Sequence, residues 1–309
     1  IHAGARPDPA TGARQTPIYQ TTAYVFRDAD HAAALFNLQE VGFIYSRLTN
    51  PTVAVLQERI ATLEGGVGAV CCSSGHAAQI MALFPLMEPG RNVVVSTRLY
   101  GGSITQFSLT IKRFGWSATF VDFDDLAAIE AAIDEDTRAV FCESVANPGG
   151  YITDLPAVAK VADAAGLPLI VDNTSATPYL CNPIAHGATL VVHSMTKYLT
   201  GNGTVTGGVV VDSGQFDWSA SDKFPSLSQP EPAYHGLKFH ETFGPLAFTF
   251  HGIAIGLRDL GMTLNPQAAH YTLMGVETLS LRMERHCQNA QTIAEWLEKD
   301  DRVEKATYA

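Results

Sequence analysis

The sequence predicts an α/β fold in which a mainly parallel, seven-stranded sheet carries helices on both faces. Seven short runs of almost continuously apolar residues are bounded by turn residues, and segments with helical spacing separate them. Parallel strands have this appearance because both of their faces are buried, and helices form the connections between them. With 309 residues, of which 46% are hydrophobic, the chain can bury a sizeable core.

The first helix is expected to begin at Pro51, which suits the first helical position, and to end at Gly65. Leu56, Ile60 and Leu63 recur within it at helical spacing. The strands are expected at Val67–Cys72, Asn92–Ser96, Ala118–Phe123, Arg138–Ser144, Pro168–Val171, Ala188–His193 and Gly207–Val211. The helices between them are expected at Gly75–Met87, at Gly101–Phe114, from a capping Asp124 to Ile133, and at Leu155–Ala165.

The segments outside the sheet differ in character. Residues 1–46 lack periodicity and are expected to form an extended arm, and residues 213–250 are aromatic, rich in Pro and expected to be irregular. Residues 266–298 have a helical pattern, and residues 302–309 resemble the start of another strand, so we expect the chain to be incomplete at its C-terminus. The expected parts are an arm over 1–46, a ligand-binding α/β domain over 47–262 and the start of a C-terminal α+β domain over 263–309.

Composition excludes several classes of function. The chain has 31 acidic and 20 basic residues and a net charge of −11, which argues against nucleic-acid or anionic-membrane partners. Its apolar runs are far shorter than the ~20 residues of a membrane span, and no signal peptide is visible. The five cysteines are expected to be small buried hydrophobes in a reducing compartment, the cytoplasm, and no Cys/His spacing resembles a metal site.

Polar residues just past the first two strands are candidate ligand-binding groups, because doubly wound sheets bind ligands at the carboxyl ends of their strands. Ser74, Gly75 and His76 open a helix, whose free N–H groups suit a phosphate. An ordinary Ser cap would give the same pattern. Tyr100 precedes two glycines and could lay its ring on a flat ligand, although a half-buried Tyr in a turn is the alternative.

Three later strands are followed by further candidates. Asn147 could hydrogen-bond a ligand oxygen or simply form a turn, and Asp172 could cap a helix or pair with a ligand cation. Lys197 lies just past the sixth strand, close to the hydroxyl groups of Ser194 and Thr196. Burial there would favour the neutral amine, which is a nucleophile for carbonyl groups, whereas the alternative is a solvated loop lysine.

Together these residues supply what pyridoxal phosphate requires: a phosphate cradle, a stacking ring, an Asp at a strand end and a Lys beyond the next strand. Lys197 would form the Schiff base with the cofactor. Asp172 would keep the pyridine nitrogen protonated, which makes the ring an electron sink. The sequence therefore predicts pyridoxal 5′-phosphate as the cofactor.

A set of motifs covers essentially the whole chain. They are Tyr45-Ser46-Arg47, Asn50-Pro51-Thr52, Ser74-Gly75-His76-Ala77-Ala78, Tyr100-Gly101-Gly102, Glu143-Ser144, Asn147-Pro148, Val171-Asp172-Asn173-Thr174, His193-Ser194-Met195-Thr196-Lys197-Tyr198 and Glu277-Thr278-Leu279. In order and spacing they resemble the motifs of the fold-type-I, pyridoxal-phosphate-dependent enzymes of cysteine and methionine metabolism. The resemblance implies the fold of that family and a transferase activity.

The resemblance also implies roles for individual residues. Lys197 would bond the cofactor, Asp172 would pair with the pyridine nitrogen, and Tyr100 would stack on the ring and assist near the leaving group. Asn147 would contact the phenolic oxygen of the cofactor. The phosphate would be held by Ser74, Gly75, His76, Ser194 and Thr196.

Tyr45 and Arg47 would reach the cofactor phosphate of a neighbouring subunit, because in this family the arm crosses the dimer interface. Sites shared in this way imply an obligate dimer. The resemblance to the family further implies a homotetramer arranged as a dimer of dimers. The arginine that binds the substrate carboxylate in the family would lie beyond Ala309. Asn202 stands where a His is common in the family.

Three segments, Ser73–Gln79, Pro232–Gly236 and Leu257–Gly261, resemble the O-acetylhomoserine sulfhydrylase subgroup. That subgroup replaces the acetate of O-acetylhomoserine with sulfide and forms homocysteine for methionine and cysteine biosynthesis. Methanethiol in place of sulfide would give methionine, and the choice between an acetyl and a succinyl donor stays open.

Other functions remain as alternatives at this stage. Methionine γ-lyase and cystathionine γ-synthase activities would use the same scaffold. A non-catalytic α/β ligand-binding protein is a more distant alternative, against which the chain lacks a G-x-G-x-x-G motif after its first strand and lacks a P-loop.

Overall fold

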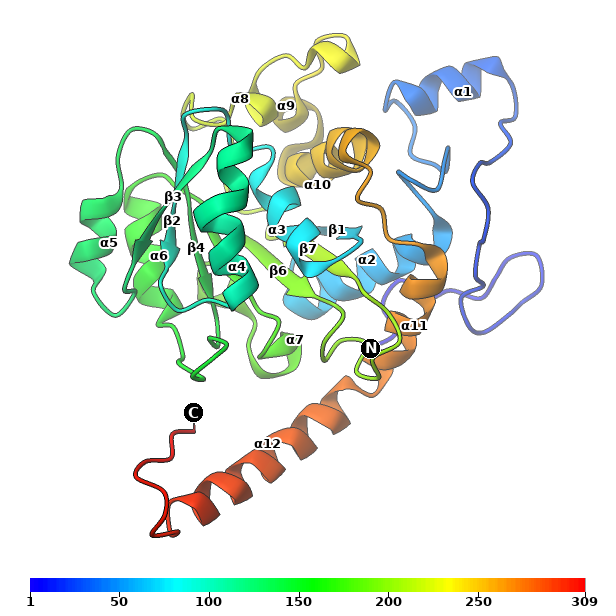
Figure 1. The fold of residues 1–309 in the computed structure, drawn as a ribbon. Coiled ribbons are helices and arrows are strands. Elements are labelled where there is room, and N and C mark those ends of the chain that lie inside the picture. The colour runs from blue at the N-terminus through cyan, green and yellow to red at the C-terminus, as the bar shows by residue number, and fades with distance from the viewer. Residues whose placement is uncertain (309) are drawn as a thin grey trace.

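A seven-stranded sheet forms the centre of the computed structural model, which describes residues 1–308 (Figure 1). The strands are β1 (Gly68–Cys72), β2 (Asn92–Ser96), β3 (Ser117–Val121), β4 (Thr137–Glu143), β5 (Leu169–Asp172), β6 (Leu190–Ser194) and β7 (Gly208–Asp212). Their order across the sheet is β1-β7-β6-β5-β4-β2-β3. Only β7 runs antiparallel to its neighbours β1 and β6, so the sheet is mainly parallel, as predicted.

The helices lie on both faces of the sheet. Alternate strand residues point to opposite faces, so that Val171 and Val191 belong to one apolar cluster while Ile170 and Val192 belong to the other. The first cluster includes residues of α2 (Pro51–Glu64), α5 (Leu126–Ala132), α6 (Leu155–Ala164) and α11 (Pro266–Glu277). The second includes residues of α3 (Gly75–Leu83), η1 (Gln106–Thr110), η2 (Ile111–Phe114) and α10 (Ala247–His251).

Local chemistry explains the ends of α2 and α3. The Asn50 side chain accepts hydrogen bonds from the N–H groups of Thr52 and Val53, and Gly65 ends α2 in the left-handed region with φ of 77°. The helix α3 ends at Leu83, four residues before the predicted end. Pro85 explains the difference, because it has no N–H with which to continue the hydrogen bonds of the helix.

Two other helices differ from prediction. The cap of α5 is Asp125, whose carboxylate accepts from Ala128 N at 3.0 Å, and not Asp124. The segment expected as one helix over 101–114 is α4 (Gly101–Thr105), which continues as the π-helix η1 and the 3₁₀-helix η2.

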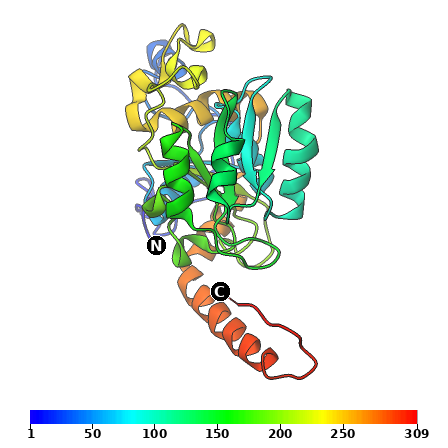
Figure 2. The same cartoon turned by 90° about the vertical axis from the view of Figure 1, so that its left-hand side faces the viewer.

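The C-terminal segment is helical, as predicted, and contains two helices. They are α11 and α12 (Leu279–Leu297), which are separated at Thr278. Figures 1 and 2 show that α12 projects away from the sheet. Residues 302–308 form no strand, contrary to the prediction, and Ala309 lies outside the described residues.

The segments expected to be extended or irregular contain short helices. The arm includes α1 (Ala29–Phe36), and α7 (Thr177–Leu180) and η3 (Pro183–His186) lie between β5 and β6. After β7 follow α8 (Pro225–Ser228), η4 (Pro232–Tyr234), α9 (Phe239–Phe243), η5 (Gly244–Leu246), α10 and η6 (Gly252–Leu260). Buried aromatic residues such as Trp218, Phe224 and Phe248 pack together there. Among the described residues, no helix combines the length and apolar character needed to cross a membrane.

Candidate active site

The carboxyl ends of three adjacent strands form the edge at which the sequence predicted a ligand. In the register of the sheet, Glu143 on β4 lies beside Asp172 on β5, and Asp172 lies beside Val192 on β6. Ser194, two residues further along β6, lies beside Gly208 on β7. The fold therefore brings the acidic and hydroxyl groups of these strand ends to one edge of the sheet.

Asp172 is half-buried at this edge and is held by its neighbours. Its Oδ1 accepts hydrogen bonds from Thr174 N at 3.0 Å and Thr174 Oγ1 at 2.5 Å, and its Oδ2 accepts from Gln79 Nε2 at 3.3 Å. Thr174 Oγ1 in turn accepts from Ser194 N at 2.8 Å, which ties β5 to β6. Among the described residues, no Lys, Arg or His forms an ion pair with Asp172. The carboxylate is thus oriented and still available to a cation.

The start of α3 packs closely against the ends of β6 and β7. A Cβ added to Gly75 would lie 2.6 Å from Ser194 Cβ, and one added to Gly208 would lie 1.9 Å from the carbonyl oxygen of Ser74. Ser74 caps the helix by accepting from Ala77 N at 3.1 Å. The glycines therefore bring the N–H groups at the start of α3 next to the Ser194 side chain, as a phosphate cradle requires.

Lys197 lies in the turn after β6, one residue beyond Thr196. Thr196 Oγ1 accepts from Gly207 N at 3.1 Å, and this bond fixes the turn to the beginning of β7. The Lys197 side chain is exposed, and it makes no hydrogen bond or ion pair within residues 1–308. The burial expected from the sequence is therefore wrong for the single chain.

The Glu143 carboxylate accepts hydrogen bonds from the backbone of both Tyr100 and Asn147. Tyr100 N donates to Glu143 Oε1 at 2.6 Å, and Asn147 N donates to Glu143 Oε2 at 2.9 Å. Tyr100 is 48% exposed, and its ring centre lies 5.9 Å from that of His76. A Cβ on Gly102 would meet both rings within 2.8 Å, so the glycine makes room for them.

The environment of Glu143 changes its acidity. Burial is the main reason that the pKa of its carboxyl rises to about 7. The hydrogen bond from Tyr100 N opposes this rise, and the nearby Asp172 carboxylate adds to it. A single carboxyl group thus links the Tyr100 and Asn147 loops and changes charge near neutral pH.

Tyr45 and Arg47 make contacts outside the strand-end group. Arg47 Nη1 donates to the carbonyl oxygen of Arg258 at 2.6 Å, and its own carbonyl oxygen accepts from Thr263 Oγ1 at 2.7 Å. The Arg47 guanidinium lies 5.5 Å from the centre of the Tyr45 ring. No hydrogen bond of the described residues joins this pair to Asp172, Lys197 or the Ser74 loop.

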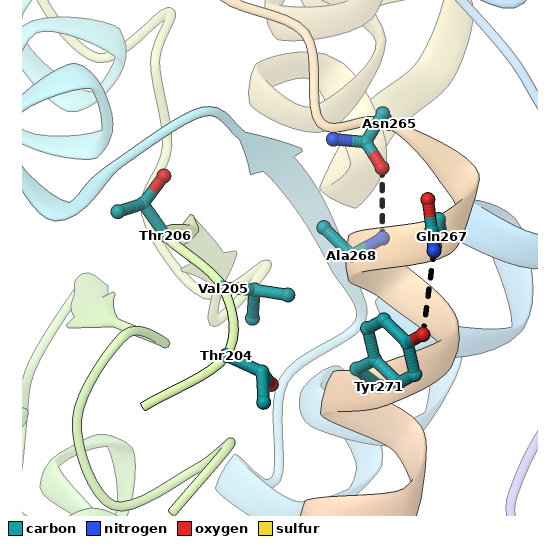
Figure 3. Close-up of a pocket in the computed structure, with 7 residues that line it drawn as sticks. All are labelled: Thr204, Val205, Thr206, Asn265, Gln267, Ala268 and Tyr271. Atoms are coloured by element: carbon teal, nitrogen blue, oxygen red, sulfur yellow. Dashed lines mark hydrogen bonds between the residues drawn. The ribbon is translucent and has the colours of Figure 1, made fainter. Parts of the chain in front are cut away.

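A polar cavity of about 340 Å³ lies between residues 204–206 and the start of α11 (Figure 3). Its lining residues are Thr204, Val205, Thr206, Asn265, Gln267, Ala268 and Tyr271, none of which the sequence predicted as a site residue. Asn265 caps α11 by accepting from Ala268 N, and Gln267 donates to the Tyr271 hydroxyl. Thr206 directly precedes the glycine that binds Thr196, so the cavity borders the predicted site. The described residues contain no cluster of side chains able to hold a metal ion.

The residues at this edge fit pyridoxal phosphate. A half-buried Asp172 without an ion-pair partner suits a protonated ring nitrogen, and the close packing of Gly75 on Ser194 gives a cradle that a larger side chain would fill. The buried Oε1 of Gln79, next to Asp172, has no hydrogen-bond partner in the described part of the chain. Tyr100 presents an exposed ring, and Lys197 presents an unengaged amine.

Sequence reasoning gave no role to several residues that hold this site. Gln79 and Thr174 orient Asp172, and Glu143 anchors the loops of Tyr100 and Asn147. All three lie inside or beside motifs that had already been identified. Their polar side chains, so close to the candidate residues in sequence, were the signal that could have indicated them.

Comparison with known proteins supports the same family. The family model for Cys/Met metabolism PLP-dependent enzymes matches residues 1–309. The chain is 50% identical to the homocysteine synthase of Schizosaccharomyces pombe, over all of this chain and 72% of that protein. It is 47% identical to the O-acetyl-L-homoserine sulfhydrylase of Leptospira meyeri, over all of this chain and 71% of that protein.

Solved structures agree with these sequence matches. A Campylobacter jejuni protein described as an O-acetylhomoserine (thiol)-lyase, crystallised with N'-pyridoxyl-lysine-5'-monophosphate, superimposes with a TM-score of 0.94. It is 41% identical, and the alignment covers 97% of this chain and 75% of that one. With a match over its whole length and relatives of 47–50% identity, this chain belongs to the Cys/Met metabolism PLP-dependent enzymes.

Proposed function

We propose that the protein is an O-acetylhomoserine sulfhydrylase, which replaces the acetate of O-acetylhomoserine with sulfide and releases homocysteine. The observation that carries the chemistry is the oriented, half-buried Asp172 at the end of β5, opposite the turn that holds Lys197. The observation that favours this substrate is the 46–50% identity to several homocysteine synthases and O-acetylhomoserine sulfhydrylases.

The strand-end residues would hold the cofactor. Asp172 would accept a hydrogen bond from the protonated ring nitrogen, Tyr100 would lie against the ring, and Asn147 would bind the phenolic oxygen. The phosphate would be held by the start of α3 and by the hydroxyls after β6, from Ser74, Gly75, His76, Ser194 and Thr196. When bound, pyridoxal phosphate supplies a carbonyl group for the substrate amine and a ring that accepts electrons from the adjacent carbon.

Lys197 would act as the proton carrier of the reaction. Its amine takes the proton from Cα of the substrate and then moves protons at Cβ, so that acetate can leave from Cγ. Hydrosulfide adds at Cγ, and Lys197 returns the protons before homocysteine leaves. Tyr100 would act as a general acid that stabilises the leaving acetate. The exposed position of Lys197 in the single chain leaves its amine accessible to the substrate.

The assembly and location are part of the proposal. Tyr45 and Arg47 would complete the phosphate site of a neighbouring copy, in a homotetramer built as a dimer of dimers. No hydrogen bond of residues 1–308 joins this pair to Asp172, Lys197 or Ser74 of its own chain, which agrees with this arrangement. We place the enzyme in the cytoplasm, since all five cysteines are free thiols.

The decisive experiment measures homocysteine formed from O-acetylhomoserine by the purified holoenzyme, with and without sulfide. We expect homocysteine that disappears when sulfide is omitted. Ketobutyrate and ammonia formed without sulfide would instead indicate a γ-lyase, and cystathionine formed with cysteine would indicate a γ-synthase. Parallel assays with methanethiol and with O-succinylhomoserine define the acceptor and the acyl donor.

A further inference from the structure

A buried polar network lies directly behind the proposed cofactor site. Glu64, the last residue of α2, has a fully buried side chain. Its Oε1 accepts from Asn173 Nδ2 at 2.9 Å and lies 2.5 Å from His193 Nε2. Asn173 and His193 are also fully buried, and Asn173 Oδ1 accepts from the Ser144 hydroxyl at 2.7 Å. One carboxylate of α2 thereby joins the ends of β4, β5 and β6.

The positions of these partners along the strands are informative. Asn173 directly follows Asp172, and His193 directly precedes Ser194. Adjacent residues of a strand point to opposite faces. Asp172 and Ser194 therefore lie on the α3 side, where the cofactor is proposed to bind, whereas Asn173 and His193 lie on the α2 side.

The regular pairing of β5 with β6 stops at the same place. The last paired residues of β5 and β6 are Asp172 and Val192, and beyond them one further backbone bond runs from Asn173 N to Val192 O at 2.9 Å. Strand ends that no longer pair need other contacts to keep a fixed geometry. Glu64 provides them from behind, where it is out of reach of the cofactor.

We propose that Glu64 is a positioning residue for the cofactor site, because it fixes Asp172 and Ser194 through their chain neighbours Asn173 and His193. The inference rests on the proposed cofactor site. Burying the Glu64 carboxylate destabilises the folded state, because the charged group loses its water. A positioning role gives this buried group a function. At metal sites, outer contacts that orient the ligands change affinity by about 10- to 100-fold, and we expect a similar scale here.

The test compares three variants of the purified protein. In Glu64→Met, the Nε2–H of His193 loses its hydrogen-bond acceptor. The carboxyl ends of β5 and β6 are then no longer held in a fixed geometry. Glu64→Gln keeps an oxygen that can accept from both Asn173 and His193. Arg59→Met is the matched control, because Arg59 is also buried on α2 but bonds Glu277 and Ala3, and neither β5 nor β6.

Two quantities are measured: the Kd of pyridoxal phosphate for the apoprotein, and the pH midpoint of the absorption of the bound cofactor. We expect Glu64→Met to raise the Kd at least about tenfold and to shift the midpoint, and Glu64→Gln to restore both to near the unaltered values. Arg59→Met should lower the melting temperature of the apoprotein and change neither quantity. If Glu64→Met does not fold, His193→Leu removes the same hydrogen bond from the strand side and should have the same effect.

Unchanged Kd and midpoint in both Glu64→Met and His193→Leu would overturn the positioning role. The same would follow if Arg59→Met moved both quantities as far as Glu64→Met does, because the effect would then reflect general destabilisation. Failure of the unaltered apoprotein to bind pyridoxal phosphate would refute the proposed cofactor site itself, and is distinguishable from both results.

Discussion

The two carboxylate oxygens of Asp172 have different partners, and the role that this implies for each oxygen can be tested. Oδ1 is occupied by Thr174, while Oδ2 faces Gln79 at 3.3 Å and is the oxygen left for a ligand. Asp172→Asn keeps an acceptor for Thr174 but removes the charge that holds a proton on the ring nitrogen. We expect kcat to fall by about 100-fold or more, with an unchanged melting temperature of the apoprotein. A kcat within about threefold of the unaltered enzyme would contradict the assigned role.

The Lys197 side chain does not stabilise the fold of the single chain, since it is exposed and forms no hydrogen bond or ion pair within residues 1–308. Lys197→Ala should therefore leave the fold intact, as judged by circular dichroism and melting temperature. Turnover should fall by about 1,000-fold or more, because no other amine replaces it. Lys160→Ala, an exposed lysine on α6, is the control and should keep full activity. Near-normal turnover by the Lys197 variant would refute the assignment.

Glu143 predicts a specific dependence of stability on pH. Its pKa is raised from 4.5 to about 7 in the folded chain, so between these values the folded state binds a proton that the unfolded state has lost. Its contribution to stability is therefore present below pH 4.5 and is lost as pH rises towards 7. Glu143→Gln cannot titrate, so its free energy of unfolding relative to the unaltered apoprotein should rise by up to about 3 kcal/mol across this interval.

Urea unfolding of the apoprotein at pH 5 and pH 7.5 measures this difference. A Glu143→Gln difference that is independent of pH would show that the carboxyl does not titrate in this range.

At the scale of elements, the N-terminus of α3 combines a structural and a binding role that mutation can separate. Ser74 caps α3 through Ala77 N, and Asp154 caps α6 through Ala157 N with the same 3.1 Å distance. Replacing either residue with Ala should cost about 1 kcal/mol of stability in the apoprotein. Only Ser74→Ala should also weaken pyridoxal phosphate, because only α3 begins at the cofactor edge. Equal cofactor affinities in the two variants would contradict a phosphate site at α3.

The elements also show how far the sequence could be interpreted. The predicted ends of the strands differ from the observed ends by no more than two residues. The agreement arises because each strand is an apolar run bounded by turn residues. The helix ends were less accurate, since Asp124 and Asp125 offer equivalent caps in sequence and only one accepts from Ala128. The helices between β7 and α11 were missed because tertiary packing of aromatic residues, rather than periodicity, stabilises them.

For the site, the sequence indicated the residues that directly follow strands and missed those that support them. Lys197, Asp172 and Tyr100 could be predicted because strand ends converge in a doubly wound sheet. Glu64 could not, because it lies 129 residues from His193 in the chain and only the packing of α2 brings the two together. Of the two alternatives for Lys197, burial and a solvated loop, the structure shows the exposed one.

At the scale of the whole molecule, the arm is the part that a single chain leaves most incompletely packed. Val25 is 98% exposed and Val41 is 81% exposed. Exposed apolar surface is one mark of an interaction site, and these side chains suit the contact with a second copy proposed above. Arg47, the residue that directly follows the arm, hydrogen-bonds Arg258 and Thr263 of its own chain.

Mixing two inactive variants tests whether the arm completes a neighbour's site. Arg47→Ala lacks the arm contribution, and Lys197→Ala lacks the catalytic amine. In a mixed dimer, the intact Lys197 of one chain meets the intact Arg47 of the other, so one of the two sites is whole. Random reassociation of equal amounts makes half of the dimers mixed, and about one quarter of the normal activity should return. If Arg47 acted within its own chain, no mixed dimer would contain a whole site, and the mixture would be no more active than its components.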